Sequence, residues 1–252
     1  MLHGLLRWLG DLLARFLSGP SRLPPAAFPV DPTLLAAALR PGDVLLVEGT
    51  RRISTAVKYL TQSTWSHATL YVGDALGPPP AGSEPLVFIE ADMVEGVRPA
   101  PLSEYVGMHT RICRPVGLQA EDVQRVIDYA VARLGHRYDL KNLIDLARYL
   151  LPIPPVPSAW RRRMLALGSG DPTRAVCSTL IAQAFQSVRY PILPVITCQD
   201  VHRSKDGRCA REIYHIRHHS LFVPRDFDVS PYFRIVKPTV EAGFDHRMLT
   251  WH

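Results

Sequence analysis

The sequence predicts an α+β fold, and two patterns along the chain lead to that prediction. Short runs rich in apolar and β-branched residues predict strands at about 43–48, 67–73, 86–91, 109–114 and 232–236. Longer stretches with apolar residues at helical spacing predict helices at about 121–134 and 140–151. The chain has 252 residues, of which 47% are hydrophobic and 21% are charged. This composition allows one sizeable core and excludes general disorder.

Residues that favour helix ends mark the limits of the predicted helices. Asp31 and Pro32 predict a short helix that continues to Leu39, because Asp is a good N-cap and Pro suits the first helical position. Gly135 ends the helix at 121–134. The proline-rich run 152–157 ends the next helix and begins an insertion that could cover a site or could be a solvated excursion.

A cysteine and a histidine far apart in the chain are the strongest functional signal. Cys177 follows a segment with Gly168, Gly170 and Pro172, so we expect it in the first turn of a helix. Exposed amides and the helix dipole there favour a thiolate. His67 begins a strand-like run that could carry an imidazole to this thiol, and such a pair makes a nucleophile for acyl groups.

A purely structural interpretation of both residues stands beside the catalytic one. Cys177 is in helical phase with Leu180, Ile181 and Ala184, so it could be a small core residue on an apolar stripe. His67 could be a histidine whose hydrogen bonds are satisfied within the core.

Seven segments, in this order, resemble the permuted papain-like cysteine hydrolases of the NlpC-type superfamily, in particular their YiiX-like branch. They cover roughly residues 40–190, with a weaker similarity at 224–227, and they are Arg40–Val47, Ile53–Lys58, Ser66–Gly73, Phe88–Ala91, Glu95–Val97, Gly135–Asp139 and Cys177–Ile181. The resemblance implies an antiparallel sheet packed against helices. It also implies that His67 is the base and that Cys177 is the nucleophile.

The resemblance further implies that Glu90 orients His67 and that Tyr138 lies near the oxyanion site. Ser178, beside the nucleophile, is a candidate for oxyanion or substrate binding. The residues themselves also favour Glu90, because it ends an apolar run where an unpaired carboxylate would be unfavourable. Asp92 and Glu95 are competitors that lie in a more polar stretch.

These residues predict a cysteine hydrolase or acyltransferase acting on an amide, ester or thioester through an acyl-enzyme. The main-chain amide of Cys177 would serve as one oxyanion donor. Relatives include enzymes that cleave peptide amides in cell walls and permuted cousins that handle lipid esters, so a small-molecule, peptide or lipid substrate is expected. The alternative is a non-enzymatic, membrane-tethered module that binds an amide or a lipid in the same pocket.

Residues 1–18 form an amphipathic pattern with a wide leucine-rich face and with Arg7, Asp11 and Arg15 opposite it. The charges make a poor signal peptide, so we expect a cytoplasmic protein, peripheral on the inner face of the membrane if this helix binds lipid. Packing of the helix on the domain or on a partner is the equal alternative. No span is long and apolar enough to cross a bilayer.

Charge and cysteine content add weaker expectations. The net charge of +6 suits an anionic surface, but no nucleic-acid motif accompanies it, so nucleic acid is not an expected partner. Four scattered cysteines do not form a disulfide framework, and Cys113 reads as a packed thiol. The stretch 198–219 contains Cys198, His202, Cys209 and three further histidines, but its spacings match no standard zinc motif, so neither a metal nor a cofactor is expected.

The domain organisation predicted from these patterns is simple. The amphipathic helix at 1–18 is followed by a linker at 19–30 and by one catalytic domain at 31–240. Insertions are expected near 152–172 and 195–222, and 241–252 is expected to form a tail.

Overall fold

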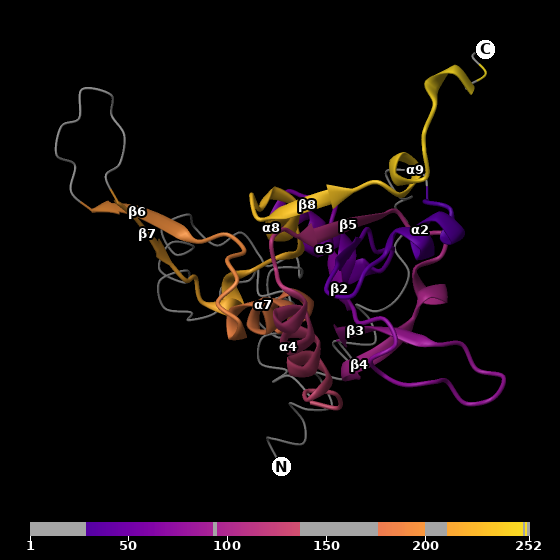
Figure 1. Ribbon diagram of the computed structural model, residues 1–252, viewed down its shortest axis with the longest axis horizontal. Coiled ribbons are helices and arrows are strands. Elements are labelled where there is room, and N and C mark those ends of the chain that lie inside the picture. Colours follow the sequence, from indigo (N-terminus) through magenta and orange to yellow (C-terminus); the bar gives the residue numbers. More distant parts are fainter. Residues whose placement is uncertain (1–28, 93–94, 137–175, 200–210, 249, 251–252) are drawn as a thin grey trace, which may run out of the picture.

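The computed structural model describes residues 29–92, 95–136, 176–199, 211–248 and 250. Its centre is a six-stranded antiparallel sheet with the strand order β4-β3-β2-β1-β5-β8 (Figure 1). The strands of this sheet are β1 (Val44–Val47), β2 (His67–Tyr71), β3 (Leu86–Asp92), β4 (Gly96–Pro101), β5 (Thr110–Pro115) and β8 (Phe233–Val236). The prediction of an α+β fold with an antiparallel sheet is therefore confirmed.

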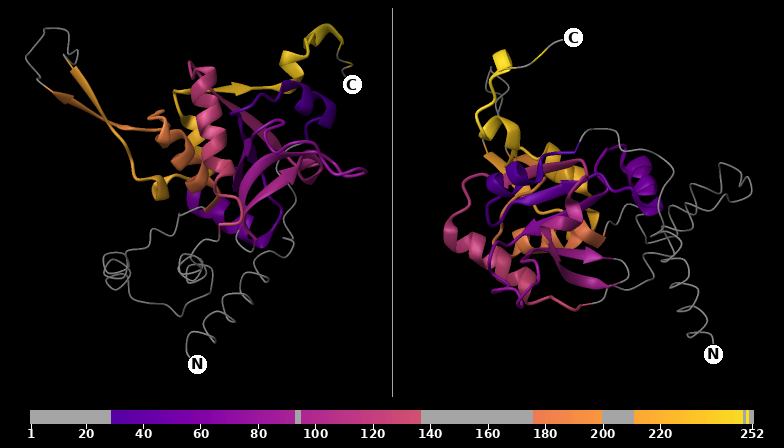
Figure 2. Two further views of the ribbon diagram at one scale, coloured as in Figure 1. Left: turned by 60° about the horizontal axis from the view of Figure 1, so that its bottom comes forward. Right: turned by 90° about the vertical axis from the view of Figure 1, so that its right-hand side faces the viewer.

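Helices cover both faces of the sheet (Figure 2). The longest are α4 (Ala120–Val131) and α7 (Val176–Ser187), which pack side by side with the larger core. The opposite face is covered by α2 (Pro32–Ala38) and by the 3-10 helix η1 (Leu102–Tyr105). The other described helices are α3 (Arg52–Thr61), η2 (His219–Leu221), α8 (Pro224–Val229), α9 (Pro238–Glu241) and η3 (His246–Met248).

The central strand β1 shows why its apolar run forms sheet. All four of its residues are buried, with Val44 and Leu46 in the core under α4 and α7 and with Leu45 and Val47 in the core under α2. A strand that is covered on both faces needs apolar side chains at consecutive positions, not alternating ones. β1 thereby fixes the position of β2, whose first residue, His67, pairs with Val47.

A turn with a buried ion pair sets the start of β1. Gly42 has a φ of +88°, a conformation that L side chains rarely adopt. Asp43 follows it and binds the Arg114 guanidinium through both carboxylate oxygens, at 2.8 and 2.7 Å. The same carboxylate accepts a hydrogen bond from the amide of Arg40, so the turn is closed on itself and tied to β5.

Most of the predicted elements lie where the sequence placed them. The five predicted strands correspond to β1, β2, β3, β5 and β8, and the predicted helix at 121–134 corresponds to α4. The helix predicted after Asp31 is α2, and the Asp31 side chain accepts hydrogen bonds from the first-turn amides as expected. The helix predicted at 140–151, the insertion near 152–172 and the amphipathic segment 1–18 lie outside the described residues.

β4 and α3 are among the elements that were not predicted as regular structure. β4 contains Pro99 and Pro101, and proline is depleted in strands. The two prolines are tolerated because β4 is the last strand at its edge of the sheet. α3 was missed because its N-cap residue, Arg51, makes no side-chain capping bond.

A separate hairpin of β6 (Val195–Gln199) and β7 (Arg211–His215) projects away from the sheet (Figure 1). It falls in the region at 195–222 that was predicted to be an insertion. Ile196 and Tyr214 are paired on one of its faces and are exposed. None of the described helices is long and apolar enough to cross a membrane.

Candidate active site

The candidate nucleophile lies at the beginning of a helix, as the sequence predicted. Cys177 is the second residue of α7, and 6% of its surface is exposed. The helix packs against β2 and β3, so its first turn meets the end of the sheet where β2 begins. The amide of Ala68 donates a hydrogen bond to the Cys177 sulfur, and His67 is also within hydrogen-bonding reach of it.

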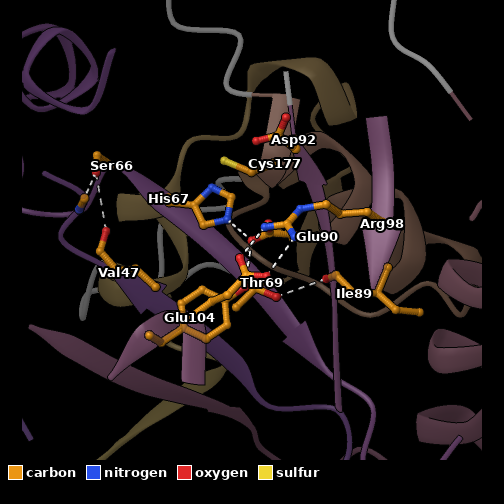
Figure 3. A network of polar contacts seen from close by, with 12 residues as sticks. Val47, Ser66, His67, Thr69, Ile89, Glu90, Asp92, Arg98, Glu104 and Cys177 are labelled. Carbon is orange, nitrogen blue, oxygen red and sulfur yellow. Dashed lines mark hydrogen bonds and ion pairs between the residues drawn. The ribbon is translucent and has the colours of Figure 1, made fainter. Parts of the chain in front are cut away.

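The candidate base occupies the first position of β2. The His67 side chain is 26% exposed, and its Nε2 lies 2.5 Å from Oε2 of Glu90. Because Nε2 faces the carboxylate, Nδ1 is the ring nitrogen left for the thiol. Figure 3 shows the imidazole ring of His67 between Cys177 and Glu90. These three side chains, from α7, β2 and β3, form the catalytic line.

The carboxylate of this line comes from β3. Glu90 is buried. Because Leu70 pairs with Ile89, the next pair in the register is Thr69 with Glu90. Thr69 is two residues from His67, so both side chains lie on the same face of β2. Burial raises the pKa of Glu90, but the positive charge and hydrogen bond of His67, the hydrogen bond of Tyr105 and the charge of Arg98 together outweigh burial and hold it at about 2. Glu90 is therefore ionised at every physiological pH.

The same interactions favour a thiolate–imidazolium pair. Burial lowers the pKa of His67, but the charges of Glu90 and Cys177 and the hydrogen bonds to both raise it to about 10. Burial raises the pKa of the Cys177 thiol, and the His67 imidazolium, together with hydrogen bonds from His67, Ala68 and Ser178, brings it below its ordinary value. The described geometry thus favours a protonated imidazole on His67 and a thiolate on Cys177.

Two residues that the sequence analysis did not identify also contact Glu90. The Tyr105 hydroxyl donates to Oε2 at 2.7 Å, and Nη2 of Arg98 lies 2.5 Å from Oε1. Neither lies in a recognisable motif. Their contact with Glu90 depends on the pairing of β3 with β4, and that strand was missed.

The competing carboxylates are paired with arginines. Asp92 forms an ion pair with Arg51 at 3.6 Å. Glu95 is 64% exposed and its nearest cation is Arg98, at 3.5 Å. Among the three acidic residues that the sequence offered, the structure places Glu90 against His67.

The remaining predicted site residues have different outcomes. Ser178 is fully buried, and its hydroxyl lies 3.9 Å from the Cys177 sulfur, so its described contact is with the nucleophile. Binding of the oxyanion or of substrate by Ser178 stays a prediction. Tyr138 lies outside the described residues.

Cys113, by contrast, is a packed thiol, as expected. It is buried in the core, and burial raises its pKa. Cys113 and Cys177 therefore have opposite electrostatic surroundings, and of these two thiols only that of Cys177 is brought toward the ionised form.

The histidine-rich stretch is described only in part. His202 and Cys209 lie outside the described residues, whereas His215 ends β7 and bonds to Thr197 at 2.7 Å. Among the described residues, no group of three or more His, Cys, Asp or Glu side chains is arranged to hold a metal ion.

Comparison with known proteins shows a family that part of this chain resembles. A family model for permuted papain-like amidase enzymes, of the YaeF/YiiX type in the C92 family, matches residues 38–149. This segment includes His67 and Glu90 and ends before Cys177. The match is to the YiiX-like family of permuted papain-like proteins, as the sequence motifs indicated, and it supports an enzyme of the cysteine hydrolase type.

Solved structures also match this chain. The crystal structure of the metalloprotein YiiX from Escherichia coli O157:H7 has 17% sequence identity to this chain and a TM-score of 0.45. The similarity covers 79% of this chain and 97% of that chain. No curated protein sequence matches the chain.

Proposed function

We propose that the protein is a thiol hydrolase that cleaves an amide, ester or thioester through an acyl-enzyme on Cys177. The observation that carries this proposal is the line of Cys177, His67 and Glu90, with the cysteine in the first turn of α7. In this line the thiol pKa is lowered and the imidazole pKa is raised, which is the condition of an activated nucleophile. A cysteine that served only to fill the core would need neither shift.

The first half of the reaction forms the acyl-enzyme. The Cys177 thiolate attacks the carbonyl carbon, and the electron pair of the C=O bond moves to oxygen. The amide of Cys177, at the N-terminal end of α7, is placed to donate a hydrogen bond to this oxyanion. His67 then gives its proton to the leaving amine, alcohol or thiol as the bond to the leaving group breaks, and a thioester to Cys177 remains.

The second half of the reaction restores the enzyme. His67 is now neutral and takes a proton from water, whose oxygen attacks the thioester carbonyl. When the carbon–sulfur bond breaks, the sulfur leaves as the thiolate and the product is a carboxylic acid. Glu90 stays ionised throughout and stabilises the imidazolium each time it forms.

The choice of substrate follows from two features. The match of residues 38–149 to a family of amidases favours an amide bond. The amphipathic pattern at 1–18 favours a substrate close to a membrane surface, and a second nucleophile in place of water would make the reaction an acyl transfer.

Acylation by an activated ester tests the proposal without knowledge of the natural substrate. The wild-type protein mixed with p-nitrophenyl acetate should release a burst of p-nitrophenol, and its intact mass should rise by one acetyl group located on Cys177. Cys177→Ala should abolish the burst, and Cys113→Ala, which removes the packed thiol, should retain it. A wild-type protein that gives no burst and no acetylated Cys177 would support the non-enzymatic binding module instead.

A further inference from the structure

We propose that Arg98 and Tyr105 are positioning residues that hold Glu90 in line with His67. The inference rests on the proposed function, because it assigns a purpose to the surroundings of the same carboxylate. Neither residue touches Cys177 in the described contacts, so any effect on the nucleophile must pass through Glu90 and His67.

Both oxygens of the Glu90 carboxylate are held. Oε2 lies 2.5 Å from Nε2 of His67 and accepts the Tyr105 hydroxyl at 2.7 Å, while Oε1 lies 2.5 Å from Nη2 of Arg98 (Figure 3). A carboxylate bound at one oxygen alone can turn about its last torsion angle, because that torsion is broad and has weak preferences. With partners at both oxygens, the orientation of Oε2 toward the imidazole is fixed.

One continuous segment supplies both partners. Arg98 is directly opposite Glu90 in the pairing of β3 with β4, and Tyr105 ends η1, which follows β4 immediately. Tyr105 is buried, and its ring meets Phe88 edge-on with 5.0 Å between the centroids. Phe88 precedes Glu90 by two residues in β3, so this ring contact holds the Tyr105 hydroxyl beside the Glu90 carboxylate.

The protonation of Tyr105 and the anchoring of Arg98 make both residues fixed hydrogen-bond donors to Glu90. Burial, and then the charge of Glu90, raise the pKa of Tyr105 well above its usual value, so its hydroxyl keeps the proton that it donates. The guanidinium of Arg98 is itself held by both carboxylate oxygens of Glu104, one of them at 2.9 Å from Nη1. Arg98 is therefore anchored from its far side, and part of its charge is balanced there.

Charge and position predict opposite effects for the loss of Arg98. If Arg98 acted only as a nearby positive charge, its removal would relieve repulsion of the His67 imidazolium and would raise the pKa of His67. If Arg98 positions Glu90, its removal frees the carboxylate, weakens the contact with His67 and lowers the pKa of His67. A merely structural residue would change stability and leave this pKa where it was.

The hydroxyl of Tyr105 can be tested against a matched tyrosine. Tyr71 meets the same Phe88 ring edge-on, at 5.2 Å, from β2. We expect Tyr105→Phe to raise the pKa that governs alkylation of Cys177 by iodoacetamide, and to slow the reaction roughly tenfold or more at mildly acidic pH, because a hydrogen bond to a charged group is lost. Tyr71→Phe should give the wild-type profile, and a Tyr105→Phe profile that coincides with it would overturn the assignment.

The guanidinium of Arg98 is tested on the pKa of His67, followed by NMR titration of the imidazole, with Arg114→Met as the matched control. Arg114 also forms a partly buried ion pair, at 2.7 Å to Asp43, in the turn before β1. Arg98→Met should lower the pKa of His67, whereas Arg114→Met should lower stability and keep the wild-type pKa of His67. A raised pKa of His67 in Arg98→Met would show that Arg98 acts by charge alone and would overturn the positioning role.

The His67→Ala protein separates failure of this inference from failure of the proposed function. If the wild-type thiol reacts with an ordinary pKa and His67→Ala reacts equally fast, both proposals fall. If His67→Ala loses the fast alkylation of Cys177, and Tyr105→Phe and Arg98→Met both retain it in full, the catalytic line stands and only the positioning role is wrong. Thermal unfolding of each variant confirms that the profiles come from folded protein.

Discussion

Replacing Glu90 by glutamine tests the electrostatics of the site with little change in shape. The pKa of Glu90 lies at about 2 instead of 4.5. At 1.36 kcal/mol for each pKa unit, that difference corresponds to about 3 kcal/mol in favour of the carboxylate. Burial opposes this shift, and His67 is the largest of the groups that favour it, ahead of Tyr105 and Arg98.

The loss of that contact should appear at both ends of the catalytic line. Glu90→Gln removes the negative charge 2.5 Å from Nε2 of His67, so the pKa of His67 should fall and that of Cys177 should rise. We expect the alkylation rate of Cys177 at mildly acidic pH to fall by roughly 30- to 100-fold, which is the equivalent of about 2–3 kcal/mol. The acylation burst should fall at least as far, because the wrong imidazole tautomer is also favoured.

The assay is the rate of iodoacetamide modification at Cys177 as a function of pH, followed by intact mass and by peptide mapping. Asp92→Asn and Glu95→Gln are the matched controls, because each neutralises a nearby carboxylate that forms an ion pair with an arginine. If Glu90→Gln has the wild-type pH profile, or if either control shows the larger loss, Glu90 does not orient His67.

Three further predictions concern pH, stability and location. The pKa of His67 is raised to about 10, so its charge stabilises the fold fully below the ordinary value of 6.5 and this contribution is lost as the pH rises through about 10. The Tm advantage of wild type over His67→Gln should shrink across that interval. Arg114→Met should lower the free energy of unfolding by about 3 kcal/mol, and Tm by about 6–12 °C, since it leaves Asp43 buried without its counter-ion. The full chain should cosediment with anionic vesicles, weakly at high salt, and a chain starting at Pro24 should not, because residues 1–18 provide the apolar face and the basic charge.

Each of these predictions has a clear contrary result. A Tm difference for His67→Gln that is constant with pH would show that the imidazole is not charged in the folded protein. Burial raises the pKa of Asp43, so the destabilisation by Arg114→Met should diminish in acid, and a loss that grows in acid would contradict the ion-pair account. A chain from Pro24 with a lowered Tm, and no vesicle binding by either protein, would show that residues 1–18 pack on the domain.

The sequence was most informative where a residue's surroundings are local. The apolar run of β1 is buried on both faces, so its pattern alone predicts a central strand. Glu90 could be preferred over Asp92 because it ends an apolar run, where an ionised group needs a partner. Cys177 could be placed in a first helical turn because the residues before it are poor helix formers.

The parts that could not be predicted depend on pairing between elements. β4 does not look like a strand, because prolines are tolerated only at the edge position that it takes in the folded sheet. The partners of Glu90 were missed for the same reason, since the contact of Arg98 follows from its register with β3 and that of Tyr105 from the helical turn after β4. No local pattern in the sequence encodes such a register.

The central claim is that Cys177 exists as a thiolate because His67 holds the compensating proton. The most direct test is the ultraviolet absorbance of the thiolate, measured as the difference between the wild-type and Cys177→Ala proteins over a range of pH. The account predicts that this absorbance persists at pH values well below the ordinary thiol pKa of about 8.5. In His67→Ala, the pKa of the Cys177 thiol should return to about 8.5. A thiolate that forms only near the ordinary pKa, with and without His67, would contradict the account.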